Sequence, residues 1–450
     1  MPSGQPITSI STNPIVAVVV AAILFAIGVA IVRRVAEAER DPWVHKALMA
    51  CLILHLVAAP LQIFVVNHLY AGVADYNRYD FQGAALAPGF RHLDFSLAPA
   101  NLRGIVADGS VSIVAGVVFA VVGVNQAAGF MVFSFMSFVG IMFFYRAFTL
   151  TFGGFGSHRY GYLIFFLPSL VFWTSDVSKE AIMIFLLGVI AYGCARILAH
   201  RGTGNWLLIL ACSAGAAFIR PNQLVLALGG FAVAMMFRPS GHGRFEPGRR
   251  FTSLVAAAAM VGIGMFVTLH FLPGLHGSLP LQQIAKNNSG TGAGFGSSGV
   301  PYSSNLLYYP RDVFVVLFDP LLFNAHGGGQ LFEAVENTVV LVVVVASLRN
   351  LRILPRASLA RPYLLMCTIF TALFCYFFAS LGNLGLITRE TTVVLPFFLV
   401  ILCIPRGPHR APPRYEWELT RRQRAARRRA RSAAPPRSAG RGQPPRVASG

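Results

Sequence analysis

Charged residues are scarce in this chain: they make up 12% of it, against 55% hydrophobic residues. A globular surface of that composition would not stay hydrated, whereas helices that face lipid need neither charge nor hydration. Lysine is scarcer still, with three of the 37 basic residues, at positions 46, 179 and 286. The composition excludes a water-soluble enzyme and predicts a membrane protein.

Motifs for metal or cofactor chemistry are also missing. The sequence has no CxxC, HExxH or DxD motif, and its six cysteines lie inside apolar stretches. Small buried core residues are the expected role of such cysteines. A GxGxxG match at residues 294–299 follows a polar loop rather than a strand, so it predicts a loop and not a dinucleotide site. No cofactor and no metal is indicated.

What fills the chain is a series of long apolar stretches, such as residues 14–32, 46–66 and 251–272. Each has the roughly 20 residues that a helix needs to cross a bilayer. We therefore predict an all-α polytopic membrane protein with about 11 transmembrane helices. Residues 161–174 are too few for a span and predict a re-entrant or interfacial half-helix, with a short ordinary span as the alternative.

The C-terminal 45 residues, 406–450, differ from the rest of the chain. They hold thirteen Arg and two Glu, and so contribute +11 of the formal charge of +20. This Arg/Pro-rich composition predicts a disordered tail beside anionic lipid headgroups, and no nucleic-acid partner. Residues 1–405 are expected to form one integral membrane domain.

The distribution of Lys and Arg predicts the topology. Short basic loops are retained in the cytoplasm, which places the loops at 196–201, 238–250 and 349–361 there, together with the tail. The N-terminus is then expected outside. The two long loops at 67–108 and 273–311 are also expected on the external face.

The first external loop carries Asp75, Arg78 and Tyr79, which share one face in helical geometry. A carboxylate beside an Arg and a phenol at the membrane surface can accept a proton from a substrate hydroxyl. The alternative is a solvated interfacial turn with an aromatic belt.

A second polar block, residues 167–180, lies between two apolar runs. Ser175 or Asp176 could cap the next helix, which would be a purely structural role. Capping does not explain Lys179 and Glu180, because ionisable groups at a membrane boundary usually pair or meet a ligand. The candidate residues of this block are Trp173, Asp176, Lys179 and Glu180.

Two predicted outward turns each carry an arginine, Arg220 before Asn222 and Arg389 within residues 383–390. The positive-inside bias disfavours Arg on that face, and guanidinium groups bind phosphate oxygens in bidentate fashion. Both are candidate phosphate ligands, although Arg also snorkels from helix ends. In the long loop, Tyr308 could stack on a sugar.

Together, the Asp-x-x-x-Tyr loop, the PSLVFWTSDVSKE block, the IRPNQ turn and the GNLGLITRE turn resemble bacterial membrane glycosyltransferases of the GT-C type, over about residues 70–400. The resemblance implies a polyprenyl-phosphate-linked sugar donor, a glycan or lipid acceptor, inversion, and a location in the bacterial plasma membrane. It implies Asp75 as the base and Lys179, Arg220 and Arg389 as phosphate ligands. The class often has an adjacent acidic pair, whereas here the next acid is Asp80.

Two rival functions remain open. A glycan polymerase or ligase of the O-antigen type would use a diphosphate-linked donor and depend on Arg220 and Arg389 but not on Asp75. A transporter or flippase would be expected to show internal repeats and paired charges at mid-membrane. No internal repeat is evident in the sequence.

Overall fold

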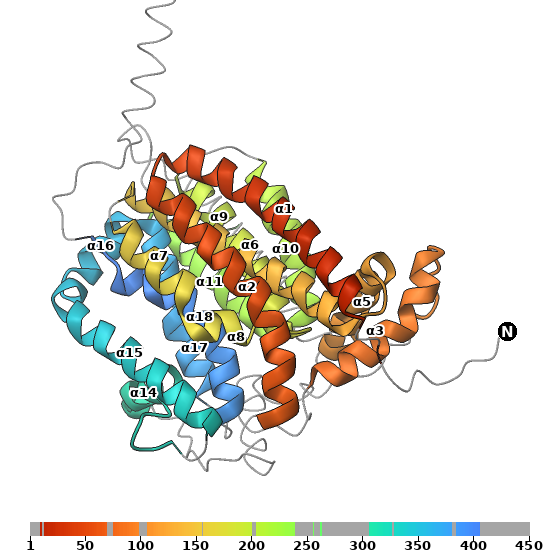
Figure 1. Ribbon diagram of the computed structural model, residues 1–450. Coiled ribbons are helices and arrows are strands. Elements are labelled where there is room, and N and C mark those ends of the chain that lie inside the picture. The colour runs from red at the N-terminus through yellow and green to blue at the C-terminus, as the bar shows by residue number, and fades with distance from the viewer. Residues whose placement is uncertain are drawn as a thin grey trace, which may run out of the picture. The chain divides into compact units, whose positions relative to one another are not determined.

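Every element in the described part of the chain is a helix, and no strand occurs there (Figure 1). The computed structural model describes residues 10, 13–69, 75–98, 106–154, 156–199, 204–238, 255, 262, 306–325, 328–379 and 384–405. The helices are α1 (Pro14–Glu39), α2 (Pro42–Leu69), α3 (Tyr76–Arg91), α5 (Val106–Val122), α6 (Gln126–Phe152), α7 (Ser157–Phe166), α8 (Pro168–Phe172), α9 (Lys179–Leu198), α10 (Asn205–Ile219), α11 (Pro221–Met236), the 3-10 helix η2 (Leu306–Tyr308), α14 (Tyr309–Phe318), α15 (Gly328–Leu351), α16 (Leu354–Ala360), α17 (Pro362–Phe378) and α18 (Leu384–Leu402).

Six of these helices are long and apolar enough to cross a membrane, and four shorter apolar helices accompany them. The six segments are Pro14–Glu39, Pro42–His68, Gln126–Phe152, Lys179–Leu198, Gln330–Leu351 and Gly385–Leu402. The all-helical, multi-pass prediction is confirmed, while the number of eleven spans stays a prediction. The predicted span at 251–272, most of the loop at 273–311 and the tail at 406–450 lie outside the described residues.

The segment that was expected to be a half-helix is a broken helix. α7 ends at Phe166, and Leu167 is extended with φ −67° and ψ 122°, as expected for a residue before proline. α8 then runs for five residues, so neither piece is long enough to span a bilayer. Membrane re-entry by this segment stays a prediction.

The cap of α9 is Ser178, whose hydroxyl accepts from the backbone N–H of Ala181 at 3.3 Å. The proposed cap at Ser175 or Asp176 is therefore wrong. The Ser175 hydroxyl instead donates to the carbonyl of Val171 at 2.5 Å. The short polar turn after α8 thus serves to start α9 with Lys179 and Glu180 in its first turn.

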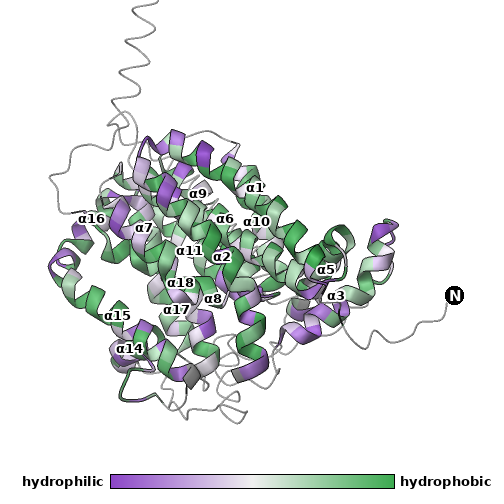
Figure 2. Ribbon diagram, in the orientation of Figure 1, coloured by the Kyte–Doolittle hydropathy of each residue, from purple (hydrophilic) through white to green (hydrophobic). Residues whose placement is uncertain are grey.

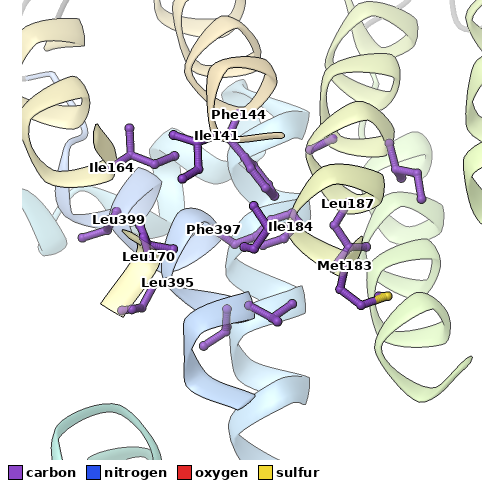
Figure 3. Close-up of a cluster of buried hydrophobic side chains, with 14 of the residues drawn as sticks. Ile141, Phe144, Ile164, Leu170, Met183, Ile184, Leu187, Leu395, Phe397 and Leu399 are labelled. Atoms are coloured by element: carbon purple, nitrogen blue, oxygen red, sulfur yellow. The ribbon is translucent and has the colours of Figure 1, made fainter. Parts of the chain in front are cut away.

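The core that positions these helix ends is built around α6 and α9. Gly140 and Gly188 let the two backbones approach so closely that a Cβ at either position would collide with the other helix. Small residues at such crossings are typical of membrane helices. Figure 3 shows the buried cluster beside this crossing, with Phe144 of α6, Ile184 of α9 and Phe397 of α18 among its members.

The predicted first external loop contains helix. α3 and α5 run side by side in the same direction, because Tyr79 near the start of α3 contacts Asp108 and Arg91 at its end contacts Phe119. Figure 2 shows hydrophobic residues along most of the helices and hydrophilic ones gathered toward helix ends. The six cysteines are free; five of them are buried, which confirms the core prediction for these five, and Cys212 is half-buried.

Candidate functional site

Five helices bring their N-terminal ends to one place in the structure. These are α3, α5, α9, α11 and α18, and each contributes charged side chains from its cap or first two turns. Three groups of ion pairs join them, and neighbours in sequence connect the groups. Helix N-termini carry partial positive charge, so their convergence favours negative charge at this point.

The outermost group joins Asp75 to Arg389. Arg389 Nη1 lies 2.7 Å from Asp75 Oδ2 although the two residues are 314 positions apart. The Asp75 side chain is 62% exposed, whereas Arg389 is 24% exposed. The Arg389 guanidinium also lies 5.7 Å from the centre of the Trp173 ring, within cation–π range. An accessible carboxylate is therefore held by a largely covered arginine.

The second group converges on Asp108, in the first turn of α5. Its carboxylate receives Lys179 Nζ at 2.6 Å, Arg78 Nη1 at 2.9 Å and the Tyr79 hydroxyl at 3.1 Å. Arg78 and Tyr79 thus share a face as predicted, but they face Asp108 rather than Asp75. Burial and the Asp108 charge raise the pKa of Tyr79 well above its usual value, so its hydroxyl stays a donor.

The third group is the most buried. Arg220, which closes α10 and opens α11, pairs with Glu180 at 2.6 Å and also with Glu390. The side chains of Arg220 and Glu180 are 11% and 5% exposed. Gln223 Nε2 donates to Glu390 at 2.6 Å, so each carboxylate has a donor.

Neighbouring residues connect the three groups into one network. Lys179 and Glu180 are adjacent on α9, and Arg389 and Glu390 are adjacent on α18. We call the eight ion-paired residues the charge cluster. They are the cations Arg78, Lys179, Arg220 and Arg389, and the carboxylates Asp75, Asp108, Glu180 and Glu390.

Two more carboxylates lie buried beside the charge cluster without an ion-pair partner among the described residues. Asp80 accepts from Gln126 Nε2 at 3.2 Å, and burial raises its pKa to about 8. Burial raises the pKa of Asp176 to about 6, against the opposing effect of the nearby Arg389 charge. One oxygen of each lacks a hydrogen-bond partner. Burial thus shifts the protonation of both groups toward neutral pH.

The structure brings most of the predicted site residues together, and three of them take no part in the ion pairs of the charge cluster. Asp80 is fully buried against α6, which gives its carboxylate no access to a substrate. Asn222 lies in the first turn of α11, two residues after Arg220, but neither Asn222 nor Tyr308 forms a hydrogen bond or ion pair with the charge cluster in the described part of the chain. The predicted residues that lie in or against the charge cluster are Asp75, Arg78, Tyr79, Trp173, Asp176, Lys179, Glu180, Arg220 and Arg389.

Sequence reasoning missed Asp108 and Glu390, which accept most of the cationic contacts. It also missed a narrow pocket beside Trp173, into which α15 directs Glu333 and Glu336. Glu336 accepts from the backbone N–H of Ser169 at 2.6 Å. The available signal was a set of acids opening or interrupting apolar runs, where an unpaired charge is costly.

Within the described residues, no group of three or more His, Cys, Asp or Glu is placed to hold a metal ion. The cations of the charge cluster can bind an anionic group, and its one accessible carboxylate, that of Asp75, can accept a proton. Comparisons with protein-family models, curated proteins and solved structures find no match to this chain.

Proposed function

We propose that this protein is a membrane glycosyltransferase that moves a sugar from a polyprenyl phosphate to an extracytoplasmic glycan or lipid, with inversion. The observation that carries the proposal is the pairing of the exposed Asp75 with Arg389 at the exposed end of the charge cluster. Such a pair offers a base and a phosphate ligand side by side.

Phosphate binding is supported by the helix N-termini and by the cations together. Backbone N–H groups and the helix dipole favour a phosphate at such ends. Arg389 and Arg220 have the forked geometry that suits phosphate oxygens, and Lys179 adds a point charge. Since four carboxylates balance the four cations, a donor phosphate has to displace one carboxylate from its cation.

Asp75 is the carboxylate best placed for that displacement, because it is the most exposed of the four and ends the network. When the donor phosphate takes Arg389, Asp75 loses its ion pair and becomes free to accept a proton.

The reaction then needs no further group. Asp75 takes the proton of the acceptor hydroxyl, and the acceptor oxygen attacks the anomeric carbon from the face opposite the phosphate. The bond from that carbon to the phosphate oxygen breaks, and polyprenyl phosphate leaves with the electron pair. Cations stabilise the charge on the leaving phosphate.

The proposed topology rests on the helix ends that lie away from the charge cluster, where Arg residues outnumber acidic residues. The positive-inside bias favours these ends in the cytoplasm, which places the charge cluster and the N-terminus outside and the tail inside. A bacterial plasma membrane with an external lipid-linked donor fits this arrangement.

The test is sugar transfer by protein reconstituted in vesicles, with a panel of polyprenyl-phosphate hexoses and pentoses as donors and mixed membrane glycans as acceptors. Asp75→Asn should lower turnover by about 100-fold or more, the range for loss of a general base. Asp94→Asn is the matched control, since Asp94 is an exposed acid in the segment between α3 and α5. Full activity of Asp75→Asn would remove the base, and if Arg389→Ala were inactive as well, a diphosphate-dependent polymerase or ligase would become the better proposal.

A transporter is the second candidate, favoured by the buried Asp80 and Asp176 carboxyls that lack an ion-pair partner among the described residues. Protonatable groups of this kind occur in proton-coupled carriers. The same vesicles distinguish the two functions. Labelled donor that crosses the bilayer with its sugar still attached would indicate transport, whereas sugar on the acceptor indicates transfer.

A further inference from the structure

A second pocket, wide open to its surroundings, lies at the turn between α1 and α2, formed by the ends of these helices. Its volume is about 320 Å³, inside the range of roughly 300–1,000 Å³ typical of ligand pockets. Arg33, Glu37 and Arg40 project from one face of α1, and Asp41 and His45 complete the wall. The pocket uses no residue of the charge cluster.

Its carboxylates form no ion pair with its arginines. Asp41 is already engaged, since Oδ1 accepts from the backbone N–H of Trp43 at 3.0 Å and Oδ2 lies 2.5 Å from His158 Nε2. Neither Arg33 nor Arg40 forms an ion pair within the described ranges. The pocket thus holds two guanidinium groups and two carboxylates that do not pair with one another. Two guanidinium groups that hold no carboxylate can receive the oxygens of an anionic group.

The surface next to the pocket is apolar. On α1, Ile23 and Ile27 are exposed, and on α2, Ile53 and Val57 are exposed. Both helices are long and apolar enough to span a membrane, so these side chains face lipid tails rather than water. A ligand that combines a phosphate with acyl chains would satisfy the pocket and this surface together.

We propose that the α1–α2 pocket binds the headgroup of an anionic glycerophospholipid. Arg33 and Arg40 hold the phosphate oxygens in the bidentate manner of guanidinium groups. Glu37 accepts from a headgroup hydroxyl, and the acyl chains lie along α1 and α2. The site is independent of the transferase proposal, and failure of either leaves the other standing.

Lipid retention on the purified full-length protein tests the proposal. Protein reconstituted with a mixture of phosphatidylglycerol and phosphatidylcholine is extracted in mild detergent, and bound lipid is counted by native mass spectrometry. The double variant Arg33→Gln, Arg40→Gln should retain at least fivefold less phosphatidylglycerol than wild type. Arg34→Gln is the matched control, because Arg34 is the exposed neighbour of Arg33 but does not line the pocket.

Two outcomes would contradict the proposal of a lipid site. If Arg34→Gln loses as much phosphatidylglycerol as the double variant, the retention reflects diffuse surface charge. If inorganic phosphate at millimolar concentration displaces the lipid, the pocket is a site for the free ion rather than for a lipid. A normal unfolding temperature of the double variant excludes misfolding as the cause.

Discussion

The two ends of the helices use scarce charge in opposite ways. At one end, the charge cluster balances four cations with four carboxylates in a connected network. At the other end cations outnumber acids, and Arg146 pairs with Glu39 there while His158 pairs with Asp41. Its cations are Arg33, Arg34, Arg40, Lys46, Arg146, Arg159, Arg196, Arg238, Arg349, Arg352, Arg356 and Arg361, and its acids are Glu37, Glu39 and Asp41.

Burial distinguishes the third group of the charge cluster from the exposed pair at the basic end. Arg220 and Glu180 are 11% and 5% exposed, so each needs a partner in place of water. At the basic end, the paired His158 and Asp41 are 52% and 32% exposed, and water can solvate them. The ion pairs of Arg220 and Glu180 therefore offset the free-energy cost of burying their charges. Exposed cations at the second end can instead contact anionic lipid headgroups.

The largest effect should come from Arg220→Met, which leaves Glu180 and Glu390 buried without their cation. Removing one partner of a buried ion pair costs about 3–5 kcal/mol. We expect a large fall in the unfolding temperature, measured by scanning fluorimetry in nanodiscs. Retention of wild-type stability would mean that water reaches these carboxylates, which removes the contrast between the two ends.

A smaller loss is expected for Asp108→Asn, which removes the charge that holds Lys179 and Arg78. Hydrogen bonds to charged groups contribute about 1.5–3 kcal/mol. The variant should also weaken binding of a polyprenyl-phosphate donor, because Lys179 loses its fixed position. Arg78→Gln is the comparison, since Arg78 is 53% exposed and should affect stability far less. Equal losses in the two variants would argue against Asp108 as the organising group.

The pH dependence of stability tests the burial of Asp80. Its pKa is raised from 3.8 to about 8, so the folded protein binds a proton that the unfolded chain releases above pH 4. Stability from this group is therefore complete at low pH and is lost as pH rises toward 8, by about 1.4 kcal/mol per pH unit. Asp80→Asn should flatten the profile between pH 5 and 8. An unchanged slope would show that Asp80 is hydrated and ionised.

The smallest effect should come from His158→Gln at the basic end. This residue pairs with Asp41 on an exposed surface, and such pairs contribute between about 0 and 1 kcal/mol. The unfolding temperature should stay close to that of the wild type in the same nanodisc assay. A loss as large as that of Arg220→Met would mean that both ends depend equally on their ion pairs.

Helical structure and buried cysteines could be predicted from the sequence because hydropathy and local spacing determine them. The break at Leu167 was not predicted, although Pro168 restricts the backbone of its immediate neighbour and was the available signal. The partners within the charge cluster could not be predicted. Asp75 and Arg389 meet only in the folded chain, 314 positions apart in sequence, and no local pattern carries that information.

Asp108 was missed because the sequence analysis searched for site residues in the polar loops between apolar stretches. It opens an apolar helix and looks like the last charge of a polar segment, yet three donors converge on it. Its signal was the cost of a carboxylate at the start of an apolar run, which demands partners. Naming those partners requires the three-dimensional arrangement of α3, α5 and α9.

Chemical cross-linking tests the account most directly, because the charge cluster requires positions 314 residues apart to meet. Protein with Asp75→Cys and Arg389→Cys is treated in membranes with a short bis-methanethiosulfonate reagent, and cross-linked peptides are identified by mass spectrometry. We expect a link between positions 75 and 389, and none in the control with Arg34→Cys and Arg389→Cys. Absence of the first link, or appearance of the second, would contradict the gathering of these charges at one end of the helices.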